Sequence, residues 1–449
     1  MAQTPRTIYA LASGHPPAGV AVIRLSGPAS EAAVEALGVS GLIPRKVSLT
    51  RLREPRTGEV LDDALAIFFK KPESYTGEDV VELHLHGGRS VIDSVTEALS
   101  GLPGLSPAEP GEFTRRAFEN GKLDLTQAEG IADLIDAETS AQRRQALRQT
   151  EGKLGELYEA WRKTLMGALA HLEADIDFAE DEDLPAGLAE NVVADLDHLR
   201  QSIIEHLADG HRGERLREGV YVVIAGPPNA GKSSLLNFLA RRDAVIVSST
   251  PGTTRDVIEV HLEFGGVPAT VVDTAGLRTA SNDIENEGIR RALARAKTAD
   301  LKIVVVEAEN WPETDNRTLE IIDENTLVAV NKIDVQALGT GYVTGDRSVF
   351  PISVTSGAGL DALVSALEKE IIDRFGLSAA PGLTRQRHRA ALQECLGSLE
   401  RFLSLRESLA AEMAAEDIRL AAQALGRITG RIDVEDLLDI VFRDFCIGK

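Results

Sequence analysis

The sequence predicts a multidomain protein with an α+β domain at the N-terminus, an all-α domain made from two separated stretches, and an α/β domain inserted between those stretches. The chain has 449 residues, more than one domain usually holds. Short β-like runs come first, and a region of alternating strands and helices is flanked on both sides by helical periodicity. The expected boundaries divide the chain into 1–120, 121–216, 217–378 and 379–449. The second and fourth segments together form the helical domain.

Composition and charge limit the classes of function. The formal net charge is −22 at pH 7, which disfavours salt-driven binding to nucleic acid by the chain alone, because such binding needs Lys and Arg to neutralise phosphates. The two cysteines, Cys395 and Cys446, do not make a disulfide framework, and this favours a reducing compartment. No apolar run reaches the length of a membrane span, and the first residues do not resemble a signal peptide. We therefore expect a cytoplasmic protein that does not bind membranes.

Short apolar runs predict the elements of the N-terminal domain. The runs at 20–23, 64–69 and 80–86 are strand-like, and the last one alternates before it stops at a pair of glycines. A helix is expected near 90–100. Three strands and a helix indicate a small α+β domain.

Apolar residues recur every three or four positions in the two flanking stretches, which predicts amphipathic helices. In the first stretch they are Leu154, Leu157, Trp161, Leu165, Ala168 and Leu172. In the second stretch they are Leu392, Leu396, Leu399 and Leu403. The acidic segment 175–187 contains Pro185 and is expected to be a loop.

A glycine-rich segment lies between an apolar, strand-like run and a helix-like run. It matches the pattern G-x-x-x-x-G-K-S/T and reads Gly226-Pro227-Pro228-Asn229-Ala230-Gly231-Lys232-Ser233. In such a loop the glycines let backbone N–H groups surround phosphates, and the following helix N-terminus adds favourable potential. Lys232 is expected to contact the β- and γ-phosphates, and Ser233 to bind Mg²⁺.

A second segment, Asp273-Thr274-Ala275-Gly276, follows the apolar run 269–272. A carboxylate at the end of a strand suits indirect binding of Mg²⁺, and the N–H of the following glycine can bind the γ-phosphate. This segment therefore belongs to the same nucleotide site.

A third segment, Asn331-Lys332-Ile333-Asp334, follows the strand-like run 327–330. Asp334 can accept hydrogen bonds from the N1–H and the exocyclic amine of guanine, a donor pair that adenine lacks. This carboxylate therefore selects GTP over ATP. Ser353 fits a loop that supports the base.

The segments between these motifs supply candidates for hydrolysis. Within 253–256 we choose Thr254 as the residue that completes the Mg²⁺ shell when GTP is bound. Leu277 stands where Ras-like enzymes carry a glutamine that orients the attacking water. Leucine cannot do this, so hydrolysis needs another base or a helper, and Glu285 and Glu287 are the nearby candidates.

Five further segments carry a resemblance to a known family: 74–82, 110–118, 121–129, 250–256 and 445–449. Through them the chain resembles, over essentially its whole length, the MnmE family of bacterial tRNA-modification GTPases, also called TrmE. The resemblance implies an N-terminal dimerisation domain similar to folate-binding modules, a discontinuous all-α helical domain, and an inserted α/β P-loop G domain of the Ras-like type.

The resemblance also implies a folate site in the N-terminal domain. Its ligand would be 5-formyltetrahydrofolate or a related one-carbon tetrahydrofolate. The positions that match the family's site are Arg24, Glu82, Lys122 and Lys449. A carboxylate at Glu82 suits the pterin N–H edge, and the cations suit the carboxylates of the ligand.

A potassium ion is implied as well. The matching positions are Asn229, Ser248, Thr250 and Thr253. Such an ion would neutralise charge between the phosphates, where another GTPase inserts an arginine. Glu285 matches the family's catalytic glutamate. The full set of expected nucleotide-binding residues is Asn229, Ala230, Gly231, Lys232, Ser233, Ser234, Ser248, Ser249, Thr250, Pro251, Gly252, Thr253, Thr254, Asp273, Thr274, Ala275, Gly276, Asn331, Lys332, Asp334 and Ser353.

The implied reaction is modification at C5 of the wobble uridine, position 34, of certain tRNAs with an aminomethyl or carboxymethylaminomethyl group. The implied assemblies are a homodimer and a heterotetramer with a flavin-dependent partner called MnmG or GidA. One alternative is a GTP-driven ribosome-assembly factor, which would usually carry a basic RNA-binding appendage that we do not find in the sequence. Another is a folate-binding protein whose GTPase only switches its shape.

Overall fold

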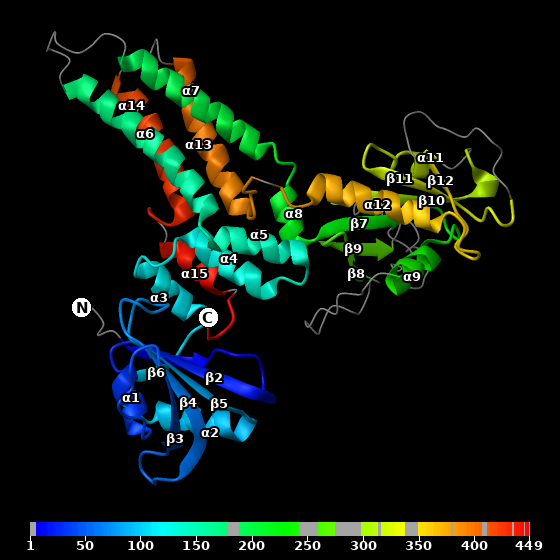
Figure 1. Cartoon of the computed structure of the whole chain (residues 1–449). Coiled ribbons are helices and arrows are strands. Elements are labelled where there is room, and N and C mark those ends of the chain that lie inside the picture. The colour runs from blue at the N-terminus through cyan, green and yellow to red at the C-terminus, as the bar shows by residue number, and fades with distance from the viewer. Residues whose placement is uncertain are drawn as a thin grey trace, which may run out of the picture. The chain divides into compact units, whose positions relative to one another are not determined.

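The computed structural model describes residues 6–177, 188–242, 259–273, 298–312, 316–336, 349–378, 380–405, 411–432, 435–443 and 445–448 (Figure 1). The chain forms two compact units. One contains Met1–Ala132, Gln149–Leu169 and Ile418–Lys449, and the other contains Asp133–Arg148 and Ala170–Asp417. Helical segments therefore contribute to both units.

A mixed sheet forms the N-terminal part of the first unit. Within the described residues it has six strands in the order β3-β4-β5-β2-β1-β6. Their bounds are β1 (Thr7–Leu11), β2 (Ala18–Ser26), β3 (Val47–Arg53), β4 (Val60–Phe69), β5 (Val80–Gly87) and β6 (Leu105–Pro107). Strands β1 and β6 are parallel, and the other neighbours are antiparallel.

One face of this sheet is buried under α1 (Ser30–Ala36) and α2 (Arg89–Ser100). Burial alternates along β4, which distinguishes the covered face of the sheet from the other face. Ala64 and Ala66 are buried, whereas Leu65 is 41% exposed. The expected strands correspond to β2, β4 and β5, but the expectation of three strands was wrong. Two of the missed strands give a weak apolar signal, because β6 has only three residues and β3 is mostly exposed. Strand β1 has the apolar run Ile8–Leu11 but was overlooked.

Helices follow the first sheet, as expected. They are α3 (Glu112–Glu119), α4 (Leu125–Asp136), α5 (Ser140–Thr150), α6 (Lys153–Asp177), α7 (Leu188–Leu207), α8 (Arg212–Glu218), α13 (Gln386–Leu405), α14 (Ala411–Thr429) and α15 (Glu435–Arg443). The predicted stripes are buried at Leu165 in α6 and at Leu392 and Leu399 in α13. Helices α7 and α13 pack together although the α/β domain separates them in the sequence. Among the helices that the structure describes, none is both long and apolar enough to span a membrane.

The inserted domain is built on a second sheet, whose described strands number six in the order β12-β11-β10-β7-β9-β8. The strands are β7 (Val220–Ala225), β8 (Glu259–Phe264), β9 (Val267–Asp273), β10 (Leu301–Glu307), β11 (Thr326–Asn331) and β12 (Val349–Pro351). Only β8 is antiparallel to its neighbour among these strands. The helices of this domain include α9 (Lys232–Arg242), α11 (Asn316–Leu319) and α12 (Leu360–Phe375).

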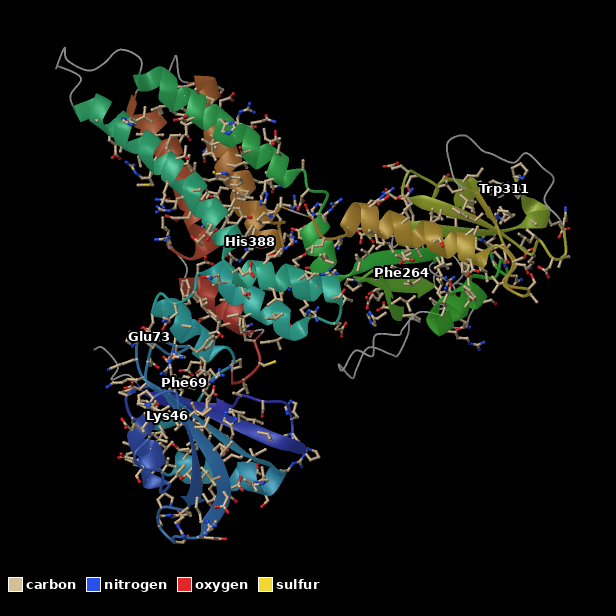
Figure 2. All side chains as sticks on the ribbon, in the orientation of Figure 1. Lys46, Phe69, Glu73, Phe264, Trp311 and His388 are labelled. Carbon is tan, nitrogen blue, oxygen red and sulfur yellow. The ribbon has the colours of Figure 1, made fainter. Side chains whose placement is uncertain are left out.

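Both faces of the second sheet are buried. Val222 and Ile224 of β7 belong to a core that includes Phe264, whereas the alternate residue Val223 belongs to a separate core with Trp311 (Figure 2). Parallel strands covered on both faces read as continuous apolar runs. This is why the runs before the three nucleotide motifs, which form β7, β9 and β11, were visible in the sequence.

A buried arginine ties together helices of the second unit. Arg389, near the start of α13, has a side chain that is 10% exposed. Its Nη2 donates to Asp209 Oδ1 at 2.7 Å, its Nη1 donates to the carbonyl of Leu207 at 2.8 Å, and its Nε lies 3.3 Å from Glu214 Oε1. The guanidinium therefore neutralises two carboxylates that lie close to the end of α7 and within α8.

We expect Arg389→Met to lower the free energy of unfolding by about 3 kcal/mol, because it leaves two largely buried carboxylates without their cation. Arg401→Met is the matched control, since Arg401 pairs with Asp417 at 3.0 Å but is 53% exposed. It should cost less than about 1 kcal/mol. Urea unfolding followed by far-UV circular dichroism measures both, and equal losses would contradict the assigned role of Arg389.

Candidate functional site

The glycine-rich loop between β7 and α9 is shaped by two close backbone approaches. Gly226 has φ 136°, and a Cβ there would lie 2.0 Å from the carbonyl oxygen of Val305. Gly231 has φ 101°, and a Cβ there would lie 2.2 Å from Nδ2 of Asn331. Asn229, between them, is also left-handed with φ 64°. Only glycine fits at the first two positions, and the resulting tight curve directs N–H groups as an anion site requires.

Lys232 and Ser233 begin α9 directly after this loop. The ammonium of Lys232 donates to the carbonyls of Gly226 at 2.9 Å and Pro227 at 2.8 Å, so it lies over the loop. The hydroxyl of Ser233 donates to Oδ2 of Asp273, which is fully buried at the end of β9. A hydroxyl and a carboxylate oxygen are ligands that suit Mg²⁺. The structure thus brings together the two residues that the sequence assigned to this ion's surroundings.

Asn331 braces the site from the end of β11. It is 4% exposed. Its Nδ2 donates to the carbonyl of Ala230 at 2.8 Å, and its Oδ1 accepts from the N–H of Val354 at 3.1 Å. Asn331 therefore joins the phosphate loop to the loop that begins at Ser353. The motif identified Asn331 as a site residue, but its bracing role follows only from the tertiary contacts.

The remaining residues of the base site differ in accessibility. Asp334, which is expected to bind guanine, is exposed. Ser353 is fully buried, and its Oγ accepts from the N–H of Ser356 at 3.1 Å. Ser353 thus shapes the loop beside the site. Ser234 is exposed on α9, next to Ser233.

Several expected residues lie outside the described part of the chain. They are Ser248, Ser249, Thr250, Pro251, Gly252, Thr253, Thr254, Thr274, Ala275, Gly276, Glu285 and Lys449.

In the N-terminal domain the structure pairs two of the expected folate residues. Arg24 of β2 and Glu82 of β5 are directly opposite in the sheet, and Arg24 Nε donates to Glu82 Oε1 at 2.9 Å. The guanidinium also lies 5.5 Å from the ring centre of Tyr75 and 5.7 Å from that of Phe113. Burial raises the pKa of the Tyr75 phenol, which stays a neutral partner for the cation.

Lys122 makes a different contact. Its Nζ donates to the carbonyl of Pro72 at 3.0 Å. The structure therefore joins Arg24 to Glu82 but gives Lys122 a backbone partner on another loop.

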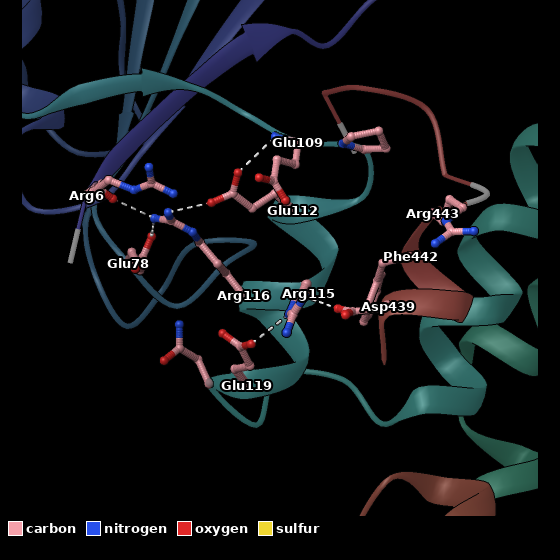
Figure 3. Close-up of a pocket in the computed structure, with 12 residues that line it drawn as sticks. Arg6, Glu78, Glu109, Glu112, Arg115, Arg116, Glu119, Asp439, Phe442 and Arg443 are labelled. Atoms are coloured by element: carbon pink, nitrogen blue, oxygen red, sulfur yellow. Dashed lines mark hydrogen bonds and ion pairs between the residues drawn. The ribbon is translucent and has the colours of Figure 1, made fainter. Parts of the chain in front are cut away.

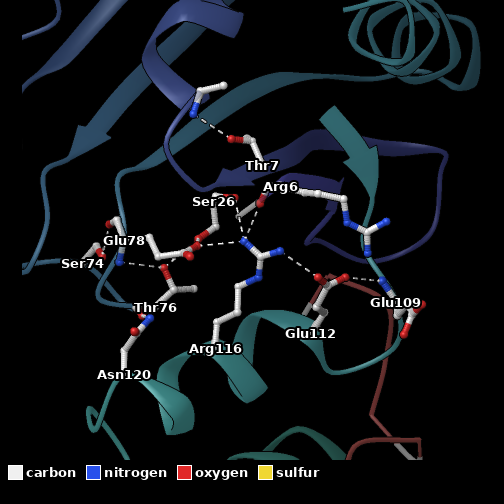
Figure 4. A network of polar contacts seen from close by, with 11 residues as sticks. Arg6, Thr7, Ser26, Ser74, Thr76, Glu78, Glu109, Glu112, Arg116 and Asn120 are labelled. Carbon is white, nitrogen blue, oxygen red and sulfur yellow. Dashed lines mark hydrogen bonds and ion pairs between the residues drawn. The ribbon is translucent and has the colours of Figure 1, made fainter. Parts of the chain in front are cut away.

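A cavity of about 610 Å³ lies elsewhere in the first unit, against α3 and α15 (Figure 3). Its wall contains Arg116, whose side chain is 13% exposed and donates to the carbonyl of Arg6, to Glu78 and to Glu112 at 2.8–3.0 Å (Figure 4). Arg115 joins α3 to α15 through Asp439 at 2.9 Å. These charges neutralise one another, so we assign them a structural role. The motif at 110–118 contains both arginines, but Glu78 and Asp439, which they contact, are distant in sequence.

Comparisons with known proteins agree with this architecture. Residues 7–122 match the family model described as the N-terminus of the GTP-binding protein TrmE, and residues 125–446 match the MnmE helical domain. The latter match spans the inserted α/β domain, as a discontinuous helical domain requires. Among solved structures, the G domain of the T. maritima FeoB iron transporter is similar over 35% of this chain and 99% of its own, with 26% identity and a TM-score of 0.24.

Curated relatives match over nearly the whole chain. The tRNA modification GTPase MnmE of Parvibaculum lavamentivorans is 56% identical over 99% of this chain and 100% of its own. The mitochondrial 5-taurinomethyluridine tRNA synthase subunit GTPB3 of Danio rerio is 47% identical over 99% of this chain and 93% of its own. The chain therefore belongs to the MnmE (TrmE) family of tRNA-modification GTPases.

Proposed function

We propose that this protein is a potassium-dependent GTPase that, with the flavin-dependent partner MnmG, modifies C5 of the wobble uridine (position 34) of certain tRNAs. The main supporting observation is the convergence of the phosphate loop, Asp273 and the Asn331–Asp334 segment at one edge of the second sheet. Similarity over 99% of the chain to relatives named for tRNA modification, including one named for a uridine product, supports the substrate class.

The hydrolytic step uses groups that this chain supplies. Backbone N–H groups of the phosphate loop and the Lys232 ammonium bind the phosphates, and Ser233 and Thr254 would hold Mg²⁺, which offsets charge on the phosphate oxygens. Because Leu277 cannot orient water, Glu285 orients the attacking water and accepts its proton.

Potassium would be held by Asn229, Ser248, Thr250 and Thr253. Asn229 fits this role, since it is exposed at a left-handed position of the phosphate loop and carries a side-chain carbonyl oxygen. The ion would add positive charge between the phosphates.

A one-carbon tetrahydrofolate is the proposed cofactor of the N-terminal domain. Glu82 would accept hydrogen bonds from the pterin, held in place by Arg24, while Lys122 and Lys449 would bind carboxylates of the ligand. The protein acts as a homodimer that joins MnmG in a heterotetramer. The modification would be an aminomethyl or carboxymethylaminomethyl group.

Nucleoside analysis of tRNA by mass spectrometry, in a strain that lacks this chain, tests the proposal. The C5-modified wobble uridine should disappear and should return when the gene is restored. Normal tRNA with a defect in ribosome assembly would instead favour the ribosome-assembly alternative. Normal tRNA and normal ribosomes would favour a folate-binding switch.

Base specificity should depend on Asp334. We expect Asp334→Asn to weaken GTP binding by about a hundredfold or more and to favour xanthosine triphosphate, because an amide presents a donor where guanine needs an acceptor. Competition binding with GTP, XTP and ATP measures this. Asp361→Asn is the control, since Asp361 is a highly exposed carboxylate of the same domain (91%). Equal affinity of the native protein for ATP and GTP would exclude the assignment.

Turnover should depend on Glu285 and on potassium. Glu285→Ala should reduce GTP hydrolysis by about a hundredfold while GTP affinity stays nearly unchanged, as expected on removal of a general base. Sodium should support slower hydrolysis than potassium, because the smaller ion fits an oxygen cage differently. Steady-state rates in matched buffers measure both effects, with Glu287→Ala as the control. Equal rates in the two buffers would exclude a role for potassium in hydrolysis. A defect only in Glu287→Ala would identify Glu287 as the general base in place of Glu285.

Folate binding should depend on Lys122. Calorimetry with 5-formyltetrahydrofolate should show binding to the native protein and affinity about tenfold lower for Lys122→Ala, since a charge-assisted contact is lost. Lys46→Ala removes an exposed lysine from the same unit and should bind like the native protein. Absence of binding to the native dimer would refute the folate proposal.

A further inference from the structure

Lys332 has a backbone conformation and a side-chain partner that its motif does not predict. Its φ is 68°, in the left-handed region. Its ammonium donates to Oε1 of Glu307 at 2.5 Å. The side chains of Lys332 and Glu307 are 41% and 20% exposed, so the pair lies at the surface edge of the sheet. The backbone conformation thus sets the direction in which the Lys332 side chain starts, and the ion pair fixes the position of its ammonium.

Glu307 belongs to the same rigid framework as the phosphate loop. It is the last residue of β10 and lies opposite Asn331 in the parallel register of β10 and β11. Two residues earlier, Val305 presses its carbonyl against Gly226. Strand β10 therefore supports the phosphate loop through its backbone and Lys332 through the carboxylate of Glu307.

Such an anchor has a physical consequence for ligand binding. Lysine is among the side chains that lose most rotamer freedom when they become ordered. An ion pair that already holds the ammonium restricts the four-carbon stem before a nucleotide arrives, and less freedom is then lost on binding. The neighbouring residue Asn331 is likewise fixed by two hydrogen bonds, so both residues present a preformed wall.

We propose that Glu307 is a positioning residue for guanine-nucleotide binding and acts by holding Lys332 in its binding orientation. The inference rests on the proposed nucleotide-binding role of Lys332. It assigns to β10 a specific contribution that the nucleotide motifs do not contain. The other role open to such a pair is local stabilisation of the domain, and the experiment separates the two.

The test is a double-mutant cycle in the full-length protein, with fluorescently labelled GDP as the probe. Glu307→Gln should weaken GDP binding about three- to fivefold, in the range of a partly exposed ion pair. The loss should appear mainly in a faster dissociation rate measured by stopped flow. Glu309→Gln is the matched control, because Glu309 is exposed two residues away and the same charge is removed. Its GDP affinity should stay within about twofold of native.

The second arm removes the partner. Lys332→Met keeps most of the apolar stem but lacks the ammonium, so adding Glu307→Gln to it should change GDP affinity by less than about twofold. The thermal midpoint of the nucleotide-free protein is followed in each variant, since a purely stabilising pair would change this midpoint without the dissociation rate.

Two results would overturn this inference and leave the proposed base site intact. These are an unchanged GDP affinity in Glu307→Gln when Lys332→Met binds weakly, and an undiminished effect of Glu307→Gln in the Lys332→Met background. If Lys332→Met and Asp334→Asn both bind GDP normally, the proposed base site is itself wrong and the inference fails with it.

Discussion

The site depends on the contact between Gly226 and the carbonyl of Val305, where the phosphate loop leaves β7 and meets β10. A side chain at Gly226 would overlap that carbonyl at 2.0 Å, so the loop must turn at this point and cannot relax outward. Gly231 meets Asn331 in the same way. Through these approaches the loop is fixed by two neighbouring strands, and its N–H groups, Lys232 and Ser233 are directed into one place. Asn331 also links this loop to the loop that begins at Ser353, because it donates to the carbonyl of Ala230 and accepts from the N–H of Val354.

In the parts of the chain that flank this domain in sequence, buried arginines form ion pairs with carboxylates. Arg389 neutralises Asp209 and Glu214 in the second unit, and Arg116 neutralises Glu78 and Glu112 in the first. In a chain with a net charge of −22, carboxylates withdrawn from water need such cations close by, since an unpaired buried charge is strongly unfavourable. The cavity beside Arg116 is lined by such paired charges, and none of the described residues expected to bind GTP is in its lining.

Features encoded by a short stretch of sequence were predicted, whereas contacts between residues distant in sequence were not. The sequence predicted strand β7, the phosphate loop and the start of α9, because their motif is contiguous. Strand β7 was clear because both of its faces are buried and its residues form one apolar run. Strand β3 was missed, since most of its side chains are exposed and edge strands lack a strong apolar pattern. The partners of Arg116, Arg389 and Lys332 were also missed. Apart from Glu112, which lies one helical turn from Arg116, each partner is far away in sequence, and no local spacing relates the two members of a pair.

Local periodicity and contiguous motifs were enough to predict the fold class and the family, because both signals lie within short stretches of sequence. The assignment of Asp334 as the guanine-selective carboxylate comes from such a motif too, and it stays a prediction. The contacts that hold the site together follow from the folded structure and not from the motifs. The fold places Asn331 between Ala230 and Val354, Glu307 against Lys332, and Arg24 against Glu82. The physical reason is that neighbouring strands bring distant residues into register, and a hydrogen bond or ion pair forms only between groups that the fold has already placed within about 3 Å of each other.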